Sequence, residues 1–347
     1  MKSKTRAVDI AICDATFISR HPELYHYTTR AGLEGIMKTR TIWAGHYQSL
    51  NDSSEVQHFR ERFSSALALK FDAVIQRQQL SVDQRRFYAK EGGPEKLARD
   101  FVDSLYDSTF EHKENYGRVE PFISSFCTHA ADRIYEQTNG LLSQWRSYTG
   151  GNGYCVVFDT SALCQLLAEE FDRLYWLHLS IAAVTYDVDG VAVDREFPTL
   201  FEACERNLQA FFDENAEPEL NTAADFWEGA SRFKHRGFYE EREVRIVAIP
   251  GTAKLAEYTK EEHPEFQVQP LPDIRQRPAN GPLRIALFEG RNVKLPITRV
   301  IVGPSRNHDE QAEKVKIARD LLGQAIPVTC SETPWIPPVG AVPKGRA

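Results

Sequence analysis

The segment Leu24–Thr29 places one imidazole, His26, between two phenols, Tyr25 and Tyr27. It stands directly before a helix signal, Ala31–Met37, in which the apolar residues recur at helical spacing. Alternate side chains of a strand point to opposite faces, so we expect the two tyrosines on one face and His26 on the other. A histidine in this setting is either a hydrogen-bonded core residue or a ligand-binding group.

A second group of reactive side chains, Glu241, Glu243 and Arg245, recurs at every second position. On a strand this spacing places two carboxylates and a guanidinium on one face, with Val244 and Ile246 on the other. Such charges are either solvated at the surface, or they form a carboxylate pair for acid–base or cation-stabilising work. In the second case Arg245 keeps one carboxylate ionised.

Three further segments contain groups that chemistry could use. The loop Gly150–Gly153 could approach a phosphate with its backbone N–H groups, although a helix-to-strand turn explains it equally well. Ser124 and Ser125 lie in the middle of a strand pattern without a G-x-S-x-G elbow, so a serine hydrolase is not indicated. Trp145 and Tyr148, three residues apart on a helix, are either core residues or a surface on which a ring stacks.

The composition is typical of a globular protein without a global attraction for polyanions. The chain has 347 residues, and 42 Lys and Arg against 49 Asp and Glu give a net charge of −7. This charge attracts neither nucleic acid nor an anionic membrane. No apolar run approaches the length of a membrane span or a signal peptide. We therefore expect a cytoplasmic protein without membrane contact.

The cysteines and histidines indicate neither a disulfide framework nor a metal site. The six cysteines lie far apart, and no pair has C-x-x-C spacing. The ten histidines form no H-E-x-x-H pattern. We expect reduced, mostly buried thiols and no bound metal.

Helix and strand patterns alternate along the chain, which favours an α+β fold in one domain, residues 1–347. A helical pattern runs from Val56 to about Phe110 and is broken at Gly92-Gly93-Pro94. Residues 260–282 are polar and rich in proline, so little structure is expected there. Strand patterns lie at 41–44, 121–127, 154–159, 178–186 and 244–249.

The two ends of the chain differ in the clarity of their patterns. Val8–Phe17 could form a helix or an added strand. Ile297–Val302, Asp309–Leu322 and Ile326–Cys330 predict a strand-helix-strand close. The expected parts of the domain are a core at about 21–250, a helical insertion at about 53–113 and a C-terminal β-α-β extension at about 283–335.

Several short motifs together resemble a large bacterial protein family of unknown function, over a stretch from about residue 24 to residue 335. Family membership alone implies no reaction. The motifs are Leu24–Thr29, Trp43, Leu50-Asn51-Asp52 with Glu55, Trp145 with Tyr148, Phe158-Asp159, Glu240 with Glu243 and Arg245, Val302-Gly303-Pro304, and Ser331 with Pro334 and Trp335.

The order of three motifs is also similar to that of the ADP-ribosyltransferases, which include DNA-modifying toxins and RNA 2′-phosphotransferases. Those enzymes carry a His or Arg on a first strand, a Ser- or Tyr-containing second strand, and a Glu on a later strand. This chain offers His26, then Ser124 and Ser125, then Glu241 or Glu243. The resemblance implies a split, curved β-sheet and NAD as the substrate.

Breaking the nicotinamide–ribose bond of NAD passes through an oxocarbenium-like species, which a carboxylate beside the ribose stabilises. The resemblance assigns this role to Glu243, and to Glu241 the positioning or deprotonation of the acceptor. His26 would bind a ribose hydroxyl or a phosphate. Arg245 would orient Glu243 or meet the pyrophosphate, and Ser124 would hold the carboxylate or the cofactor.

The remaining NAD-binding residues implied by the resemblance are Thr28, Ser125 and Tyr148, with Tyr27 or Trp145 stacked on a ring. The cluster of Asn51, Asp52 and Glu55 has no counterpart in the general pattern. It is either a substrate-binding group or a helix cap.

The first hypothesis is therefore an NAD-dependent ADP-ribosyltransferase-like enzyme, or an NAD glycohydrolase. The acceptor could be a protein, a nucleic acid or a small molecule. By analogy, such an enzyme could be a bacterial toxin or phage-defence effector with a partner protein or antitoxin. One alternative is a non-catalytic nucleotide-sensing or partner-binding module. Another is a metal-dependent hydrolase of nucleotides or nucleic acids that uses Asn51, Asp52, Glu55 and the Glu pair.

Overall fold

The computed structural model describes most of the chain, in nine segments. Helices and a mostly antiparallel, curved sheet make up the structure, so the α+β prediction is confirmed. The described residues are 12–49, 55–78, 80–111, 120–150, 153–187, 193–212, 222–276, 280–323 and 325–334.

The main sheet contains ten strands and is forked. Eight strands follow the order β12-β11-β4-β1-β3-β2-β10-β9, while β8 pairs with both β3 and β5. The strands are β1 Glu23–Thr29, β2 Ile42–His46, β3 Phe122–Cys127, β4 Gly153–Asp159, β5 Trp176–Ala183, β8 Glu243–Pro250, β9 Ile274–Gln276, β10 Leu283–Leu287, β11 Ile297–Val302 and β12 Val328–Cys330.

The fork lies between β1 and β3. Strand β1 pairs with β4 along its whole length, from Glu23 to Thr29. With β3 it shares a single register position, Tyr25 opposite Cys127. Beyond this pair β3 continues beside β2 instead. The second half of β1 and the middle of β3 therefore border a gap in the sheet, and this gap positions the site described below.

Three groups of buried side chains pack against the sheet. One core joins β1, β4 and β8 to α2 Arg30–Thr39, α8 Thr160–Arg173 and α13 His308–Leu322. A second core joins the other face of β3 and β8 to the helical part of the chain. A third, smaller core packs α7 Leu142–Thr149 against β1 and β4.

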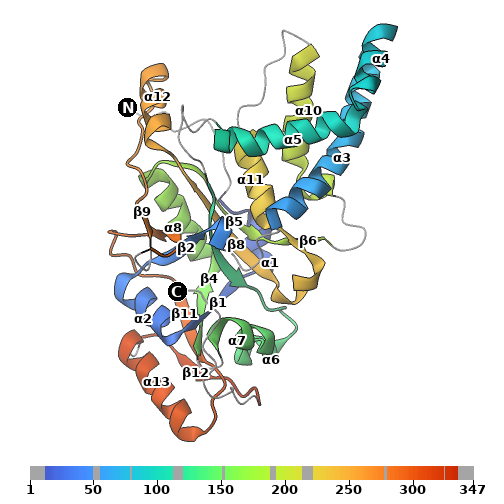
Figure 1. Ribbon diagram of the computed structural model, residues 1–347. Helices are drawn as coiled ribbons and strands as arrows, with labels where there is room; N and C mark the ends of the chain where they lie inside the picture. Colours follow the sequence, from blue (N-terminus) through green and yellow to red (C-terminus); the bar gives the residue numbers. More distant parts are fainter. Residues whose placement is uncertain are drawn as a thin grey trace.

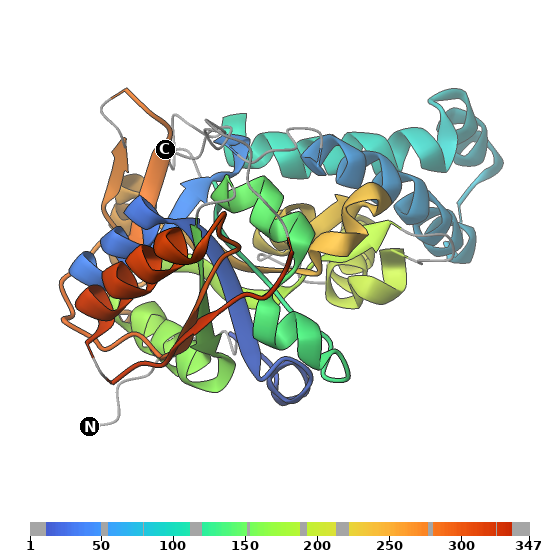
Figure 2. The same cartoon turned by 90° about the horizontal axis from the view of Figure 1, so that it is seen from below.

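The predicted helical insertion lies between β2 and β3, and it consists of three helices rather than two. A break at residues 78–81 accompanies the expected one before Gly93. These helices project to one end of the molecule, while α2 and α13 lie together at the other end (Figures 1 and 2). The helices around the second core are α3 Glu55–Arg77, α4 Val82–Lys90, α5 Gly93–Glu111, α9 Val193–Glu196, α10 Pro198–Phe212 and α11 Thr222–Arg232.

The strand-helix-strand close is confirmed, since β11 and β12 pair in parallel and α13 connects them. Strand β9 forms within the stretch where little structure was expected, because it pairs with β10, which pairs with β2 and so extends the sheet. The remaining elements are short. They are α1 Ala15–Arg20, α6 Ile134–Asn139, α12 Ala253–Glu262, the two-stranded sheet of β6 Thr185–Asp187 and β7 Phe233–His235, and the 3₁₀ helices η1 Tyr47–Ser49 and η3 Arg236–Glu241.

The N-terminal segment corrects the expectation about the cysteines. Cys13 and Cys164 form a disulfide that ties this segment to α8, while Cys127, Cys155, Cys204 and Cys330 are free. Of the stretch predicted as helix or strand, residues 8–11 lie outside the described residues, and α1 begins at Ala15. Among the described helices, none combines the length and the apolar character needed to cross a bilayer.

Candidate functional site

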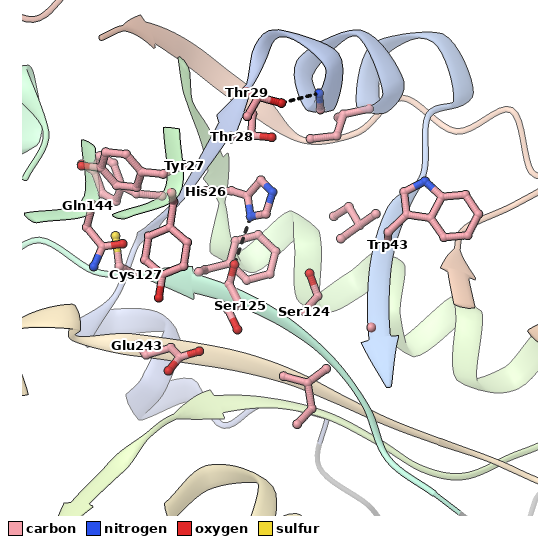
Figure 3. Close-up of a pocket in the computed structure, with 18 of the residues that line it drawn as sticks. His26, Tyr27, Thr28, Thr29, Trp43, Ser124, Ser125, Cys127, Gln144 and Glu243 are labelled. Atoms are coloured by element: carbon pink, nitrogen blue, oxygen red, sulfur yellow. Dashed lines mark hydrogen bonds between the residues drawn. The ribbon is translucent and has the colours of Figure 1, made fainter. Parts of the chain in front are cut away.

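A pocket of about 620 Å³ lies in the fork of the sheet. Its walls come from β1, β2, β3 and β8, from the first turn of α2 and from one face of α7. His26, Ser124 and Glu243, which are far apart in the sequence, all line it. Figure 3 shows their side chains, with Ser125 between His26 and Glu243.

His26 reaches across the gap between β1 and β3. Its Nδ1 lies 3.0 Å from the backbone oxygen of Ser125, and its ring packs on Phe126 at 5.5 Å between centroids. A carbonyl oxygen only accepts, so Nδ1 carries the proton in this contact. The side chain is half-buried and lines the pocket. His26 is therefore not sealed in the core.

The end of β1 forms the wall next to His26. Thr28 and Thr29 both line the pocket. The Thr29 hydroxyl accepts the N–H of Gly32 at 3.2 Å and so caps α2. A Cβ atom at position 32 would lie 1.9 Å from the Thr28 hydroxyl oxygen, so glycine is required for this packing.

Ser124 and Ser125 lie on opposite faces of β3 and both contribute to the pocket. Ser124 is 2% exposed, and its hydroxyl has no hydrogen-bond partner in the described part of the chain. The Ser125 hydroxyl is also buried without a hydrogen-bond partner in the described residues, and its nearness to Glu243 helps to lower the pKa of that carboxyl. A buried hydroxyl without a partner is costly, so Ser124 offers a polar contact to a bound molecule.

Arg245 is the centre of a buried ion-pair cluster behind the pocket. Its Nη1 and Nη2 donate to the two carboxylate oxygens of Glu55 at 2.7 and 3.0 Å. Its Nε and Nη2 donate to the two oxygens of Glu243, both at 2.9 Å. A further bond of 2.6 Å joins Nη1 to the backbone oxygen of Ser231.

Lys234 brings the third carboxylate into this cluster. Its Nζ lies 2.6 Å from Glu241 Oε2 and 2.9 Å from Glu243 Oε2. Glu241 also accepts the Tyr148 hydroxyl on its other oxygen at 2.9 Å. Glu241 and Tyr148 both line the pocket, so the cluster extends from the interior to the pocket wall.

These cations decide the protonation of Glu243. Burial alone would raise its pKa, but the neighbouring charges of Arg245 and Lys234 outweigh burial and lower the pKa to about 2. The Glu243 N–H donates to the Tyr186 hydroxyl at 2.8 Å, which fixes the backbone as well. Glu243 is therefore a fixed negative charge and not a proton acceptor near neutral pH.

The structure corrects the prediction that Glu241, Glu243 and Arg245 share one strand face. Strand β8 begins at Glu243, and Glu241 ends the 3₁₀ helix η3. Arg242 between them adopts a left-handed conformation, with φ 42°. Glu241 and Glu243 nevertheless lie close together, as predicted. They do so because both contact Lys234, and not because they share a strand face.

Of the two rings expected to stack on a ligand, Tyr27 lines the pocket and Trp145 does not. Trp145 is 0% exposed, and its Nε1 donates to the backbone oxygen of Asn139 at 2.9 Å. The Tyr27 ring contacts the indole edge-on, and its hydroxyl accepts the N–H of Leu141 at 2.7 Å. Trp43, which is half-buried on β2, is the tryptophan that lines the pocket.

Arg245 and Glu55 do not have the ligand contacts expected of them. Arg245 is 1% exposed, and its N–H groups donate to Glu55, Glu243 and the Ser231 backbone. It therefore orients Glu243 and is not placed to bind a pyrophosphate. Glu55 is buried and pairs with Arg245, and it does not line the main pocket. It borders a separate pocket of about 260 Å³. Asn51 and Asp52 lie outside the described residues.

Cys127 and His129 lie beside each other at the end of β3 but lack the character of a catalytic dyad. Their Sγ and Nε2 atoms lie 3.9 Å apart. Burial raises the pKa of the Cys127 thiol, with the charges of Glu243 and Glu241 acting in the same direction. Burial lowers the pKa of His129 to about 4. The thiol therefore resists losing its proton and the imidazole resists gaining one, so a thiolate–imidazolium pair is disfavoured.

Three carboxylates of the metal hypothesis, Glu55, Glu241 and Glu243, do lie close together, but they are paired with cationic side chains of the protein. Arg245 and Lys234 lie between Glu55, Glu241 and Glu243. No group of three His, Cys, Asp or Glu among the described residues has the arrangement of a metal site. A divalent ion at this position would have to displace two ion-paired side chains.

Two residues of the site were missed in the sequence, Lys234 and Gln144. Lys234 stands between Phe233 and His235 in a short strand, and its carboxylate partners on β8 and α3 are not visible from its own neighbourhood. Gln144 is one helical turn before Tyr148, and that spacing indicates a shared face of α7.

The comparisons with known proteins identify a family for part of the chain. Residues 144–246 match a family described as "Protein of unknown function (DUF2971)". The predicted resemblance to a family of unknown function is confirmed over this stretch, which is shorter than the expected range of about 24–335. It runs from α7 to β8 and includes Lys234, Glu241, Glu243 and Arg245, whereas β1 and β3 precede it. No curated protein and no solved structure matches the chain.

Proposed function

We propose that this chain binds NAD in the pocket of the forked sheet, cleaves the nicotinamide–ribose bond and transfers ADP-ribose to an acceptor. The observation that supports this function is that His26, Ser124 and Glu243 line one pocket. They come from three strands in the order that the resemblance to ADP-ribosyltransferases implies. The forked, curved sheet is compatible with the fold of those enzymes.

Glu243 provides the charge that the reaction needs. When the bond between ribose C1′ and the nicotinamide nitrogen breaks, the electron pair leaves with nicotinamide and positive charge develops on the ribose. A carboxylate held ionised by Arg245 and Lys234 stabilises that charge without reorganising. Because its pKa is about 2, Glu243 acts electrostatically and not as a base.

The acceptor requires a second group, because its nucleophilic atom loses a proton as it attacks C1′. Glu241 is suited to this task, since it lies at the pocket wall with Tyr148 on one oxygen and Lys234 on the other. His26 would hold a ribose hydroxyl, and Trp43 offers a ring surface for a base. The capped start of α2 lies beside them and suits a phosphate.

The test is incubation with NAD labelled in its adenylate moiety, with released nicotinamide measured separately. Wild-type protein should release nicotinamide, and Glu243→Gln should lower that rate by about 100-fold or more, because the fixed charge is lost. Glu241→Gln should reduce labelling of the acceptor more than release of nicotinamide. Glu240→Gln is the matched control, since Glu240 is an exposed neighbour and should leave both rates unchanged.

The acceptor assay is run with a bacterial lysate, with its protein and nucleic-acid fractions, and with small molecules alone. Nicotinamide release without a labelled acceptor identifies an NAD glycohydrolase. Wild-type protein that releases no nicotinamide in any of these conditions overturns the proposed enzyme. A lysate component that restores release would instead point to a partner or activator.

One observation favours a second candidate, a nucleotide-binding module without catalysis. Both carboxylate oxygens of Glu243 already accept hydrogen bonds from Arg245 or Lys234. A carboxylate satisfied in this way contributes to stability even without a substrate. The module predicts NAD binding by calorimetry with no release of nicotinamide.

A further inference from the structure

Gln144 is a buried amide that faces the pocket without a protein partner. Its side chain is 5% exposed, and it belongs to the pocket lining. In the described part of the chain its carboxamide makes no hydrogen bond. Its amide atoms are not sealed in the interior but reach the pocket space, where they are open to a hydrogen-bond partner. A bound molecule would supply the missing partner.

The position of Gln144 is fixed by its neighbours on α7. Trp145 anchors the helix, because its Nε1 donates to the backbone oxygen of Asn139 and the indole is buried in the third core. Glycine at position 140 permits this, since a Cβ atom there would lie 2.8 Å from Trp145 Nε1. Gln144 is therefore held in place by an anchored helix.

The same helix relates Gln144 to the carboxylates. Gln144, Ser147 and Tyr148 are three and four residues apart, so they share the face that lines the pocket. The Tyr148 hydroxyl donates to Glu241 at 2.9 Å. Gln144 thus lies one helical turn from the tyrosine that contacts Glu241. In Figure 3, Gln144 and Trp43 are at opposite sides of His26.

A side-chain amide both donates and accepts, and its best complement is another primary amide. Nicotinamide carries such a group on the ring that leaves the ribose. We infer that Gln144 binds the carboxamide of NAD and so directs the nicotinamide end toward α7 and the adenine end toward Trp43. This inference rests on the proposed function, and it adds selection for a carboxamide over a carboxylate.

The charges nearby act in the same sense. Glu241 and Glu243 would repel the carboxylate of nicotinic acid adenine dinucleotide. The carboxylate also lacks the donor that the Gln144 carbonyl needs. Wild-type protein should therefore bind NAD at least about 10-fold more tightly than this deamidated analogue.

The test compares three ligands by calorimetry at constant ionic strength: NAD, nicotinic acid adenine dinucleotide and ADP-ribose, which lacks the ring. Gln144→Leu should weaken NAD binding about 10- to 100-fold. It should leave ADP-ribose affinity within about 2-fold, since no contact to the ring exists there to lose. Gln144→Glu should weaken NAD binding as well. Gln76→Leu is the matched control, because Gln76 is an exposed residue of α3.

Each outcome decides the inference. If Gln144→Leu weakens ADP-ribose as much as NAD, the residue is merely structural and the inference is overturned. Unchanged NAD binding in Gln144→Leu also overturns it, while the proposed function stands if wild-type protein still releases nicotinamide. If wild-type protein binds neither NAD nor ADP-ribose, both proposals fail together. NAD binding without turnover, lost selectively in Gln144→Leu, supports the inference on a non-catalytic module.

Discussion

Among single residues, Arg245 and then Lys234 contribute most to keeping Glu243 ionised. Arg245 contacts Glu55 and Glu243, while Lys234 contacts Glu241 and Glu243. Two cations thus serve three carboxylates. Glu243 has a pKa of about 2 and stays ionised at every pH well above that value. Any pH dependence of NAD cleavage above pH 5 must therefore come from other groups. Its own stabilising contribution is lost only as pH falls from about 4.5 toward 2.

The first prediction for a single residue concerns His129 and the pH dependence of folding stability. Its ring stacks on Tyr25 at 3.7 Å, and burial lowers its pKa from 6.5 to about 4. Between these values the unfolded chain binds the proton and the folded chain does not. Stability should therefore rise as pH increases from about 4 to 6.5, by at most about 3 kcal/mol from this group.

The check is urea unfolding across this pH range for His129→Phe, which keeps a ring on Tyr25 but cannot titrate. The slope of unfolding free energy against pH should flatten relative to wild type. His308→Phe is the control, because His308 is exposed and should keep the wild-type slope. Parallel slopes for wild type and His129→Phe would contradict the assignment.

At the scale of elements, short runs of apolar and β-prone residues located β1, β3, β4 and β8 correctly, because these strands are largely buried. The turn before β8 was not predictable. The left-handed residue there is Arg242, a residue type with no preference for that conformation. The break at residues 78–81 likewise lacks the glycine or proline that usually marks one.

The sites of Trp145 and Gln144 show why side chains on one helix were harder to assign than the helix itself. Helical spacing identifies α7, but the two residues are adjacent and both buried. Trp145 packs where Gly140 and Gly303 leave room for an indole, and Gln144 faces the pocket. The packing of Trp145 and the exposure of Gln144 to the pocket both depend on segments that are distant in the sequence. Their positions cannot be predicted from the α7 pattern alone.

The disulfide between the N-terminal segment and α8 makes the prediction at this scale. Peptide mapping of protein purified without reductant, with thiols trapped at lysis, should yield Cys13 linked to Cys164. Reduction should lower the free energy of unfolding by about 2–4 kcal/mol, because the bond closes a loop across 151 positions.

Cys330→Ala is the control for this measurement, since Cys330 is free and its loss should leave the effect of reductant unchanged. Alkylation of both Cys13 and Cys164 in the trapped sample would contradict a bond present in the cell. It would also agree with the reducing cytoplasm expected from the sequence. A linked pair would instead indicate an oxidising environment or a protected bond.

At the scale of the whole molecule, two of the three cores meet at the ion-pair cluster. The helices α3 and α11 belong to the second core, and β8 contributes to both large cores. Arg245 on β8 binds Glu55 at the start of α3 and the Ser231 carbonyl on α11. The helical insertion is therefore not an independent appendage, because it provides a partner for the guanidinium that holds Glu243.

This arrangement predicts that Glu55→Gln destabilises the protein by about 3 kcal/mol, because it leaves part of a buried guanidinium charge uncompensated. The urea midpoint should fall accordingly, whereas Glu61→Gln, on the exposed face of the same helix, should change stability by less than about 0.5 kcal/mol. If both variants unfold at the wild-type midpoint, α3 does not support the site through Arg245. A loss confined to Glu55→Gln ties the insertion to the pocket, since the same guanidinium orients the carboxylate at its wall.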